Sequence, residues 1–212
     1  LQFEAVWALT NVLSGSPEDT QHVISLGCIE KILKLIECNE SCADLVDQCV
    51  WALGNISADS AGSRDLVLSH GTLSIILPFF KTNNPTNQRL SFLRNATWVL
   101  ANMMGGQPSV SIEYVKDVFP ILIDLIQNQT DEQVLTDACW ALSHTLDRPH
   151  ISNVIESGLL EALPQLLNHS NQVLRKEAVW ILSSIAAGTV SQVQKAIDAG
   201  LVQQAFDILN NS

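Results

Sequence analysis

The chain has 212 residues, of which 47% are hydrophobic, and a formal net charge of -11 at pH 7. This much apolar sequence supports a buried core and argues against disorder, yet no apolar run approaches the roughly 18 residues that a membrane span needs. The excess of acids argues against nucleic acid as the main partner, because phosphate binding needs clustered lysines and arginines. It indicates either cationic ligands or a solvated acidic surface.

A short phrase centred on tryptophan occurs five times, as AVWALTN, CVWALGN, ATWVLAN, ACWALSH and AVWILSS. The tryptophans follow one another at intervals of 44, 47, 42 and 40 residues: Trp7, Trp51, Trp98, Trp140 and Trp180. A second marker precedes an apolar segment with the same period: Gly27, Gly71, Gly158 and Gly200, with Asp117 in the third unit. Such spacing is typical of a repeat array.

Each unit is predicted to form three helices, because its apolar residues recur with a period near 3.6 rather than in alternation. Short first helices are expected at 18–26, 62–69, 109–115, 150–156 and 191–199. Second helices follow the marker at 28–37, 72–81, 117–126, 159–168 and 201–210. Pro78 and Pro164 are expected to kink their helices, whereas Pro120 fits a first turn. The third helix carries the tryptophan phrase.

A three-helix unit of this length is typical of armadillo or HEAT repeats, which stack into a superhelix with a long concave surface. We therefore predict an all-α fold, a right-handed armadillo-repeat superhelix (solenoid) with three helices per repeat. Residues 1–212 would form a single array, cut at both ends. It would contain a partial repeat 1–14, repeats at about 15–58, 59–105, 106–146 and 147–187, and a partial repeat 188–212.

A large aromatic at a fixed helix position usually belongs to the core, but helix geometry places these tryptophans elsewhere. Residues two before, two after and five after each tryptophan are small or mostly apolar. They lie roughly 140–160° from it and predict the buried stripe. The residues beside the tryptophan are polar. Three positions before it stand Glu4, Gln48, Asn95, Asp137 and Glu177, and four after it Asn11, Asn55, Asn102, His144 and Ser184.

Together these residues predict a surface that holds an extended peptide. An asparagine amide can donate to one peptide carbonyl and accept from one peptide N–H without reading the sequence. Parallel indoles between such asparagines form slots for the aliphatic stems of lysine or arginine, with cation–π attraction. Nearby carboxylates would meet the charged ends. The pattern therefore indicates binding of an extended basic peptide.

The stretches LQFEAVWALTNVLSG, QCVWALGNISADS, RNATWVLAN and DACWALS resemble the importin-alpha (karyopherin-alpha) family of nuclear import adaptors. The resemblance covers essentially the whole chain and implies that a concave groove binds nuclear localisation signals rich in lysine and arginine. It implies slots formed by Trp7, Trp51 and Trp98, and backbone binding by Asn11, Asn55 and Asn102. It also implies a pocket for the critical lysine at Gly15, Thr20 and Asp59. Later basic side chains would be lined by Gln48, Asn95, Asp137 and Trp140.

The chain also departs from that family. His144 stands where a tyrosine is usual, Ser184 where an asparagine would be, and Gly105 where an arginine is common. A secondary site at Glu177 and Trp180 is therefore a weaker expectation. The resemblance further implies cargo proteins with basic signals, shuttling between cytoplasm and nucleus, and importin-beta binding through a segment that this chain lacks. No cofactor, metal, nucleic acid or membrane partner is expected.

Three other readings of the chain compete with this one. A catenin-type armadillo scaffold has a basic groove for acidic peptides, which the charge of -11 opposes. An enzyme is disfavoured, because Cys139 and His144 are five residues apart on one helix and do not face each other, and no phosphate loop or zinc spacing occurs. A purely structural array without a peptide ligand is the third. The five cysteines are predicted to be buried free thiols.

Overall fold

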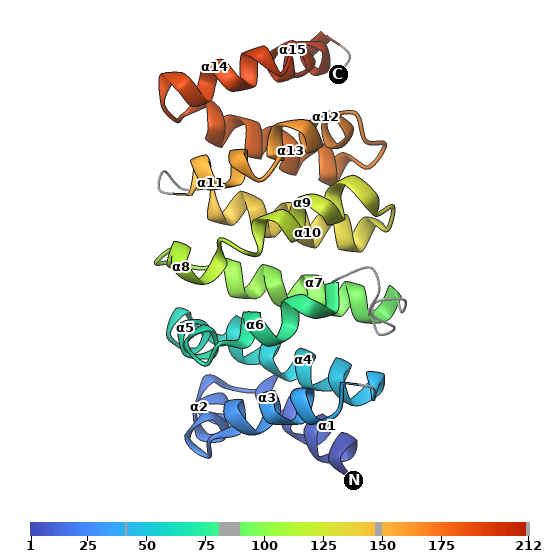
Figure 1. Cartoon of the computed structure of the whole chain (residues 1–212), viewed down its shortest axis with the longest axis vertical. Coiled ribbons are helices and arrows are strands. Elements are labelled where there is room, and N and C mark those ends of the chain that lie inside the picture. Colours follow the sequence, from blue (N-terminus) through green and yellow to red (C-terminus); the bar gives the residue numbers. More distant parts are fainter. Residues whose placement is uncertain (41, 81–89, 147–149, 211–212) are drawn as a thin grey trace. The chain divides into compact units, whose positions relative to one another are not determined.

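The computed structural model describes residues 1–40, 42–80, 90–146 and 150–210, and every regular element in these ranges is a helix (Figure 1). The chain divides into two compact units, Leu1–Val110 (unit 1) and Ser111–Ser212 (unit 2). The all-α fold built from three-helix repeats is thus confirmed. That both units form one continuous array stays a prediction.

Unit 1 contains seven α-helices in its described part and one 3₁₀ helix. They are α1 (Gln2–Leu13), α2 (Pro17–Ser25), α3 (Cys28–Cys38), α4 (Ala43–Asp59), α5 (Ala61–Ser69), α6 (Thr72–Ile76), η1 (Leu77–Phe80) and α7 (Leu90–Met104). The helices that carry the tryptophan phrase, α1, α4 and α7, pack side by side in that order. Ser16 and Ser60 cap the N-termini of α2 and α5 with their side-chain oxygens, which satisfies orphan amides there.

Unit 2 repeats the same arrangement. Its elements are α8 (Ile112–Val115), α9 (Phe119–Asn128), α10 (Glu132–Thr145), α11 (Ile151–Glu156), α12 (Leu159–Leu167), α13 (Gln172–Ala186), α14 (Val190–Asp198) and α15 (Leu201–Asn210). The tryptophan helices α10 and α13 pack against each other, and the second helices α9 and α12 pack against them.

The marker glycines begin the second helices for a conformational reason. Each has a positive φ (Gly27 70°, Gly71 74°, Gly158 98° and Gly200 73°), a conformation that glycine adopts without steric cost. The prolines behave less uniformly. Pro120 lies in the first turn of α9, as predicted. At Pro78 the second helix changes from α6 to the 3₁₀ helix η1, whereas α12 continues through Pro164 to Leu167.

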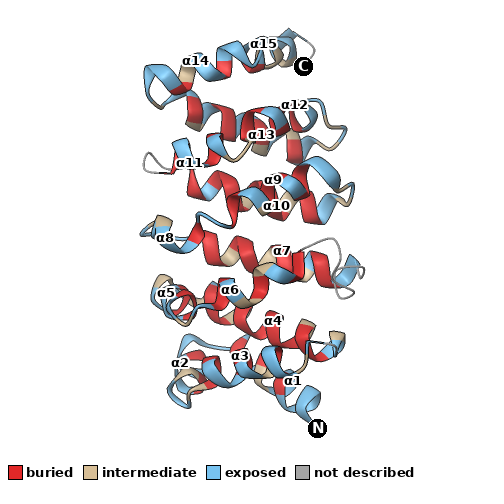
Figure 2. Cartoon of the chain, viewed as in Figure 1, coloured by how far each residue is buried: buried red, intermediate tan, exposed pale blue. Residues whose placement is uncertain are grey.

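The predicted apolar stripe is the core in four of the five tryptophan helices (Figure 2). In α4, for example, Cys49, Leu53 and Ile56 are completely buried. The prediction is wrong for α1, where Val12 is exposed and the buried residues are Val6, Thr10 and Leu13. In the described structure α1 packs against α2 and α4, so burial follows the flank of α1 that has neighbours.

The thiols are only partly as predicted. All five cysteines are free, and Cys28, Cys49 and Cys139 are buried, but Cys38 and Cys42 are exposed. Burial raises the pKa of both Cys49 and Cys139 to about 12. Within the described ranges, no three histidine, cysteine or acidic side chains are grouped so that they could hold a metal ion. None of the described helices has the length and apolar character to cross a membrane.

Candidate functional site

The tryptophans lie at the surface of both units. The exposed fractions of Trp7, Trp51 and Trp180 are 53%, 47% and 62%, and Trp98 and Trp140 are half-buried. Trp51 lies on the side of α4 opposite the buried Leu53. We call the surface formed by the tryptophans and the residues four positions later the Trp–Asn face. In unit 1 it comprises Trp7, Asn11, Trp51, Asn55, Trp98 and Asn102.

Close packing of α4 against α7 holds the indole of Trp98. A Cβ atom on Gly54 would lie 2.6 Å from Cζ3 of Trp98 and 2.6 Å from Cγ2 of Val99, far inside van der Waals contact. Gly54 therefore lets the ring rest on the backbone of the preceding repeat. Sequence reasoning missed this role, although the signal was present. The residue three after each tryptophan is always small: Thr10, Gly54, Ala101, Ser143 and Ser183.

The three asparagines of unit 1 differ in how far their amides are already used. Asn11 is exposed, and Asn55 donates through Nδ2 to the backbone oxygen of Thr10 in the preceding repeat at 3.1 Å. Asn102 is half-buried, and its Nδ2 is inaccessible to water with no hydrogen-bond partner among the described residues. Buried polar atoms without a partner are rare in native proteins. A ligand carbonyl would satisfy this one only after the side chain of Asn102 turns its Nδ2 outward.

The residues three positions before the tryptophans connect neighbouring repeats. Gln48 is almost fully buried and donates through Nε2 to Oγ1 of Thr10 at 2.8 Å. Asn95 donates through Nδ2 to the backbone oxygen and to Oδ1 of Asp47, at 3.1 and 2.6 Å. Both amides were predicted to line the path of later basic side chains. Their N–H donors hold repeats together instead, and Asn95 brings the carboxylate of Asp47 to this place, which the sequence did not indicate.

The predicted lysine pocket takes Gly15 from the segment between α1 and α2, Thr20 from α2 and Asp59 from α4. Asp59, at the last position of α4, is half-buried and accepts hydrogen bonds from Ser63 Oγ at 3.0 Å and Gln21 Nε2 at 3.5 Å. No lysine or arginine in the described ranges pairs with it. Gln21 follows Thr20, which is nearly completely buried, with its hydroxyl donating to the carbonyl of Leu13 at 3.5 Å.

Gly15, the remaining pocket residue, is exposed. Because Gln21 of α2 donates to Asp59, the structure brings Asp59 against the helix that carries Thr20. The hydroxyl proton of Thr20 is used by the Leu13 carbonyl, so Thr20 could offer a ligand only its acceptor lone pairs. Sequence reasoning missed the two neutral side chains that position the carboxylate, Gln21 and Ser63.

In unit 2 the residues four after the tryptophans bond to their own helices. His144 stacks on Trp140, with ring centroids 3.9 Å apart and planes at 30°. The Nδ1 of His144 lies 2.9 Å from the backbone oxygen of Trp140, so this nitrogen carries the proton. Ser184 donates through Oγ to the oxygen of Trp180 at 3.1 Å. Neither side chain is an amide that could serve a peptide backbone.

The acids of unit 2 that were predicted to contact basic side chains are only partly accessible. Asp137 is 9% exposed, and both its carboxylate oxygens accept hydrogen bonds from Gln133 Nε2, at 3.1 and 3.0 Å. Burial raises the pKa of Asp137, and the bond from Gln133 opposes that shift in part. Glu177 is half-buried, three residues before the exposed Trp180 on the same helix.

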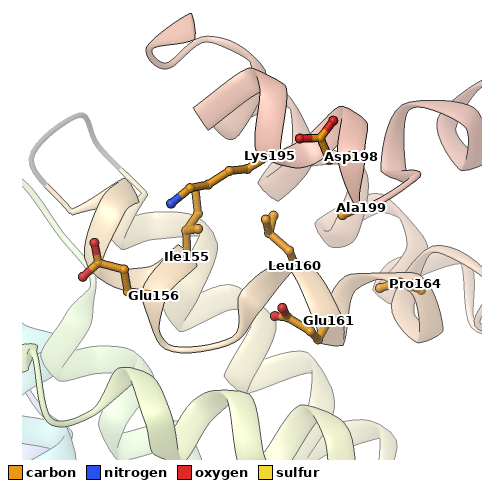
Figure 3. Close-up of a pocket in the computed structure, with 8 residues that line it drawn as sticks. All are labelled: Ile155, Glu156, Leu160, Glu161, Pro164, Lys195, Asp198 and Ala199. Carbon is orange, nitrogen blue, oxygen red and sulfur yellow. The ribbon is translucent and has the colours of Figure 1, made fainter. Parts of the chain in front are cut away.

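A pocket of about 550 Å³ lies elsewhere in unit 2, between α11, α12 and α14 (Figure 3). Its apolar floor includes Ile155 and Leu160, and its polar side chains include Glu156, Glu161 and Lys195. None of its lining residues belongs to a tryptophan helix. The pocket is therefore separate from the Trp–Asn face.

A family model, the Armadillo/beta-catenin-like repeat, matches residues 16–58, 110–146 and 147–187. The whole chain is 39% identical to 39% of importin subunit alpha-3 and 42% identical to 46% of importin subunit alpha-4, both of Arabidopsis thaliana. Importin subunit alpha-B of Dictyostelium discoideum is 45% identical over 89% of this chain and 36% of its own length. The chain thus spans less than half the length of these curated relatives.

Two solved structures resemble the chain in fold. A designed armadillo repeat protein in complex with the peptide (KR)4 has a TM-score of 0.81 and 25% identity, covering 95% of this chain and 82% of that one. A computationally designed armadillo repeat protein for modular peptide recognition has a TM-score of 0.83 and 24% identity over the same shares. The family match, the relatives and the fold agree, and the resemblance to importin-alpha that the tryptophan phrases indicate is confirmed.

Proposed function

Because the chain belongs to the armadillo-repeat family, we propose that unit 1 binds extended basic peptides on its Trp–Asn face and that the protein is a nuclear import adaptor. The observation that carries the proposal is the repeated pair of a surface indole and an asparagine amide, four residues apart on one helix. Asn11 is exposed, and the Nδ2 of Asn102 is buried without a partner among the described residues. An unpaired buried donor is costly, and turning it outward onto a ligand acceptor offsets that cost.

The spacing of the face suits an extended peptide. Packed helices lie about 8–10 Å apart, and an extended chain rises about 3.3 Å per residue. Consecutive tryptophan helices are therefore about three peptide residues apart. Asn11, Asn55 and Asn102 would bond to the peptide backbone, and side chains between these bonds would lie between the indoles.

Charge favours lysine and arginine as those side chains. The stems of both residues pack on apolar surface while their ends stay polar, and a cation over an indole is attracted by its negative face. Asp59 would meet the ammonium of one lysine, with Gly15 contributing its carbonyl and Thr20 its hydroxyl lone pairs. Asp59 is already oriented by Ser63 and Gln21, so little ordering would be needed at binding.

The relatives support the functional class. Importin alpha subunits similar to the whole chain support cargo proteins with nuclear localisation signals as partners, and also shuttling between nucleus and cytoplasm. The designed protein that carries the basic peptide (KR)4 supports a basic ligand. Importin-beta would be a further partner of the complete protein. The same comparisons support a binding role rather than catalysis.

Unit 2 would contribute less. Trp140, Asp137, Glu177 and Trp180 keep the aromatic and acidic parts of the pattern, but His144 and Ser184 replace the amides. We therefore assign the principal site to unit 1 and an auxiliary one to unit 2.

Intrinsic tryptophan fluorescence tests the proposal directly. The chain would be titrated at near-physiological salt with a peptide that has a Lys-Lys-Arg-Lys core, and with the same peptide carrying alanine at the critical lysine. We expect saturable binding that weakens at least about tenfold for the alanine peptide, since a charge-assisted bond is lost. Equal binding of both peptides would mean diffuse charge attraction, and preference for a Glu-rich peptide would indicate a catenin-type scaffold. No binding of any peptide would leave a structural array.

A further inference from the structure

A buried arginine outside the Trp–Asn face holds the loop that follows Asn102. The side chain of Arg64, in α5, is 1% exposed. Its Nη1 donates to the carbonyl of Gly105 at 2.5 Å, and its Nη2 donates to the carbonyl of Pro108 at 2.9 Å. Its Nε donates to Oδ1 of the neighbouring Asp65 at 2.9 Å. One guanidinium therefore joins α5 to two points of the chain segment after α7.

The corresponding position in the other repeats does not hold a charge. Seven residues before the marker glycine stand Thr20, Arg64, Ile151 and Val193, and all but the last of these are buried. Burying a guanidinium costs free energy unless its donors find acceptors. In this repeat the acceptors are the loop carbonyls. The arginine thus replaces a small or apolar residue only where there is a loop to hold.

The loop itself differs from its counterparts. Residues 14–16 join α1 to α2, and Ser60 alone joins α4 to α5, but residues 105–111 join α7 to α8. Gly106 within it has a φ of +90°, and a Cβ there would lie 3.2 Å from Nη1 of Arg64. The guanidinium and the loop backbone are therefore in close contact, and both the conformation and the space at this position favour glycine.

The held segment continues the last turn of α7, which carries Asn102. The amide of Gly105 donates to the carbonyl of Ala101 at 2.9 Å, so Gly105 closes the turn that contains Asn102. The final carbonyls of a helix lack intrahelical donors, and such turns fray. A cation at this end also interacts favourably with the helix dipole. Fixing Gly105 therefore restricts the orientation of the Asn102 side chain.

We propose that Arg64 is a positioning residue for peptide binding: by holding Gly105 and Pro108 it keeps the last turn of α7 ordered, and with it the place from which Asn102 would bond to the ligand backbone. This inference rests on the proposed function, because it assigns Asn102 a ligand. It adds a residue that touches no peptide and that neither the tryptophan phrase nor the charge pattern indicates.

The test is a double-mutant cycle on peptide affinity, read by tryptophan fluorescence with the Lys-Lys-Arg-Lys peptide. Arg64→Lys keeps the charge but loses the two-pronged geometry, and it should weaken binding about three- to tenfold, as expected for one hydrogen bond lost. In an Asn102→Ala background the same change should alter affinity less than about twofold, because coupled residues are non-additive. In an Asn11→Ala background its full effect should remain. A general loss of structure would act equally in both backgrounds and would overturn the proposal.

Asp65→Asn is the matched control, because it removes the charge of the half-exposed carboxylate, keeps an oxygen that can accept from Arg64, and changes neither partner of the two loop bonds. It should bind as the unmodified chain does. Gly106→Ala tests the same loop from its other side with Arg64 retained, and should weaken binding in the same Asn102-dependent way. This variant keeps the proposal testable if Arg64→Lys fails to fold. Thermal melts of each variant establish that titrations are made well below Tm.

Hydrogen exchange without peptide separates this inference from the proposed function. Backbone amides of residues 101–107 should exchange faster in Arg64→Lys, and their exchange should be unchanged in Asp65→Asn. Unchanged exchange in Arg64→Lys would contradict the inference that Arg64 orders this segment, even if peptides bind. Should the unmodified chain bind no basic peptide, the peptide role of Arg64 falls together with the proposed function, whereas faster exchange would still show that it orders the loop.

Discussion

The tryptophan helices of unit 1 and unit 2, apart from α1, share a buried stripe, but the two units differ at the position four residues after the tryptophan. Unit 1 has Asn11, Asn55 and Asn102 there, and unit 2 has His144 and Ser184. The side chains of unit 2 bond to the carbonyl of their own tryptophan, a local partner that histidine and serine reach easily. The same helical framework thus carries an asparagine amide in one unit, and in the other a side chain that is hydrogen-bonded to its own helix.

This difference shows that fold and recognition are separable within a repeat. The stripe residues set how neighbouring repeats pack, and they are equally buried in α4 and α13. The residue at the fourth position differs between these helices while the stripe stays buried, although in α4 it also bonds to the preceding repeat. Four experiments would break or sharpen the comparison, from the largest expected effect to the smallest.

Asp59→Ala should weaken binding of the basic peptide by about 1.5–3 kcal/mol, the value of a charge-assisted hydrogen bond. It removes the carboxylate that Ser63 and Gln21 orient and leaves the bound ammonium without a counter-charge. Affinity would be measured by fluorescence titration. Asp44→Ala and Asp65→Ala are the controls. Equally small effects from all three would contradict a defined lysine pocket in unit 1.

Gly54→Ala should lower the free energy of unfolding by about 1–3 kcal/mol, as overpacking does, because its Cβ would overlap the ring of Trp98. Elsewhere in a helix the same change stabilises by roughly 0.5–1 kcal/mol. Urea unfolding would measure it. Gly62→Ala, where the only neighbour of a new Cβ is 4.0 Å away, should be neutral or stabilising. In unit 2 the equivalent Ser143→Ala should change little, and a Gly54→Ala variant as stable as the parent would refute the close approach.

Asn55→Ala should weaken peptide binding by about 0.5–1.5 kcal/mol, the net value of one neutral hydrogen bond. His144→Ala in unit 2 should change affinity by less than about twofold, because its ring nitrogen is already bonded to Trp140. Asn55 also bonds to the Thr10 carbonyl, so melts must accompany the titrations. Equal effects of the two substitutions would mean that the units bind alike.

A pH-dependent contact between repeats of unit 1 should give the smallest effect. Nε2 of His70 lies 2.9 Å from Oε1 of Glu30, and the Leu66 carbonyl, followed by this glutamate, raises the pKa of His70. The contribution of the contact is therefore complete below the unfolded pKa of about 6.5 and is lost as pH rises through the raised folded value. His70→Ala should lower Tm at pH 5.5 more than at pH 8.5. The difference should be small, since Glu30 is largely exposed and solvent screens the pair.

The sequence by itself determined the repeat, the three helices of each repeat and the surface location of the tryptophans. These follow from periodicities of 3.6 residues and of about 44 residues, which are local or translational properties of the chain. The marker glycines belong to the same class, since the left-handed conformation at Gly27 or Gly158 is a single-residue preference.

Only the tertiary structure decided which polar atoms remain available. Gln48 and Asn95 read as ligand contacts in sequence, yet their donors bond to neighbouring repeats. The bond of Arg64 to Gly105 joins residues 41 positions apart, and the sequence pattern did not indicate that the donor of Asn102 is buried. Hydrogen bonds are short-ranged and directional, so a pattern along the chain can propose which side chains share a face, whereas only the packed repeats determine which of those side chains already have partners.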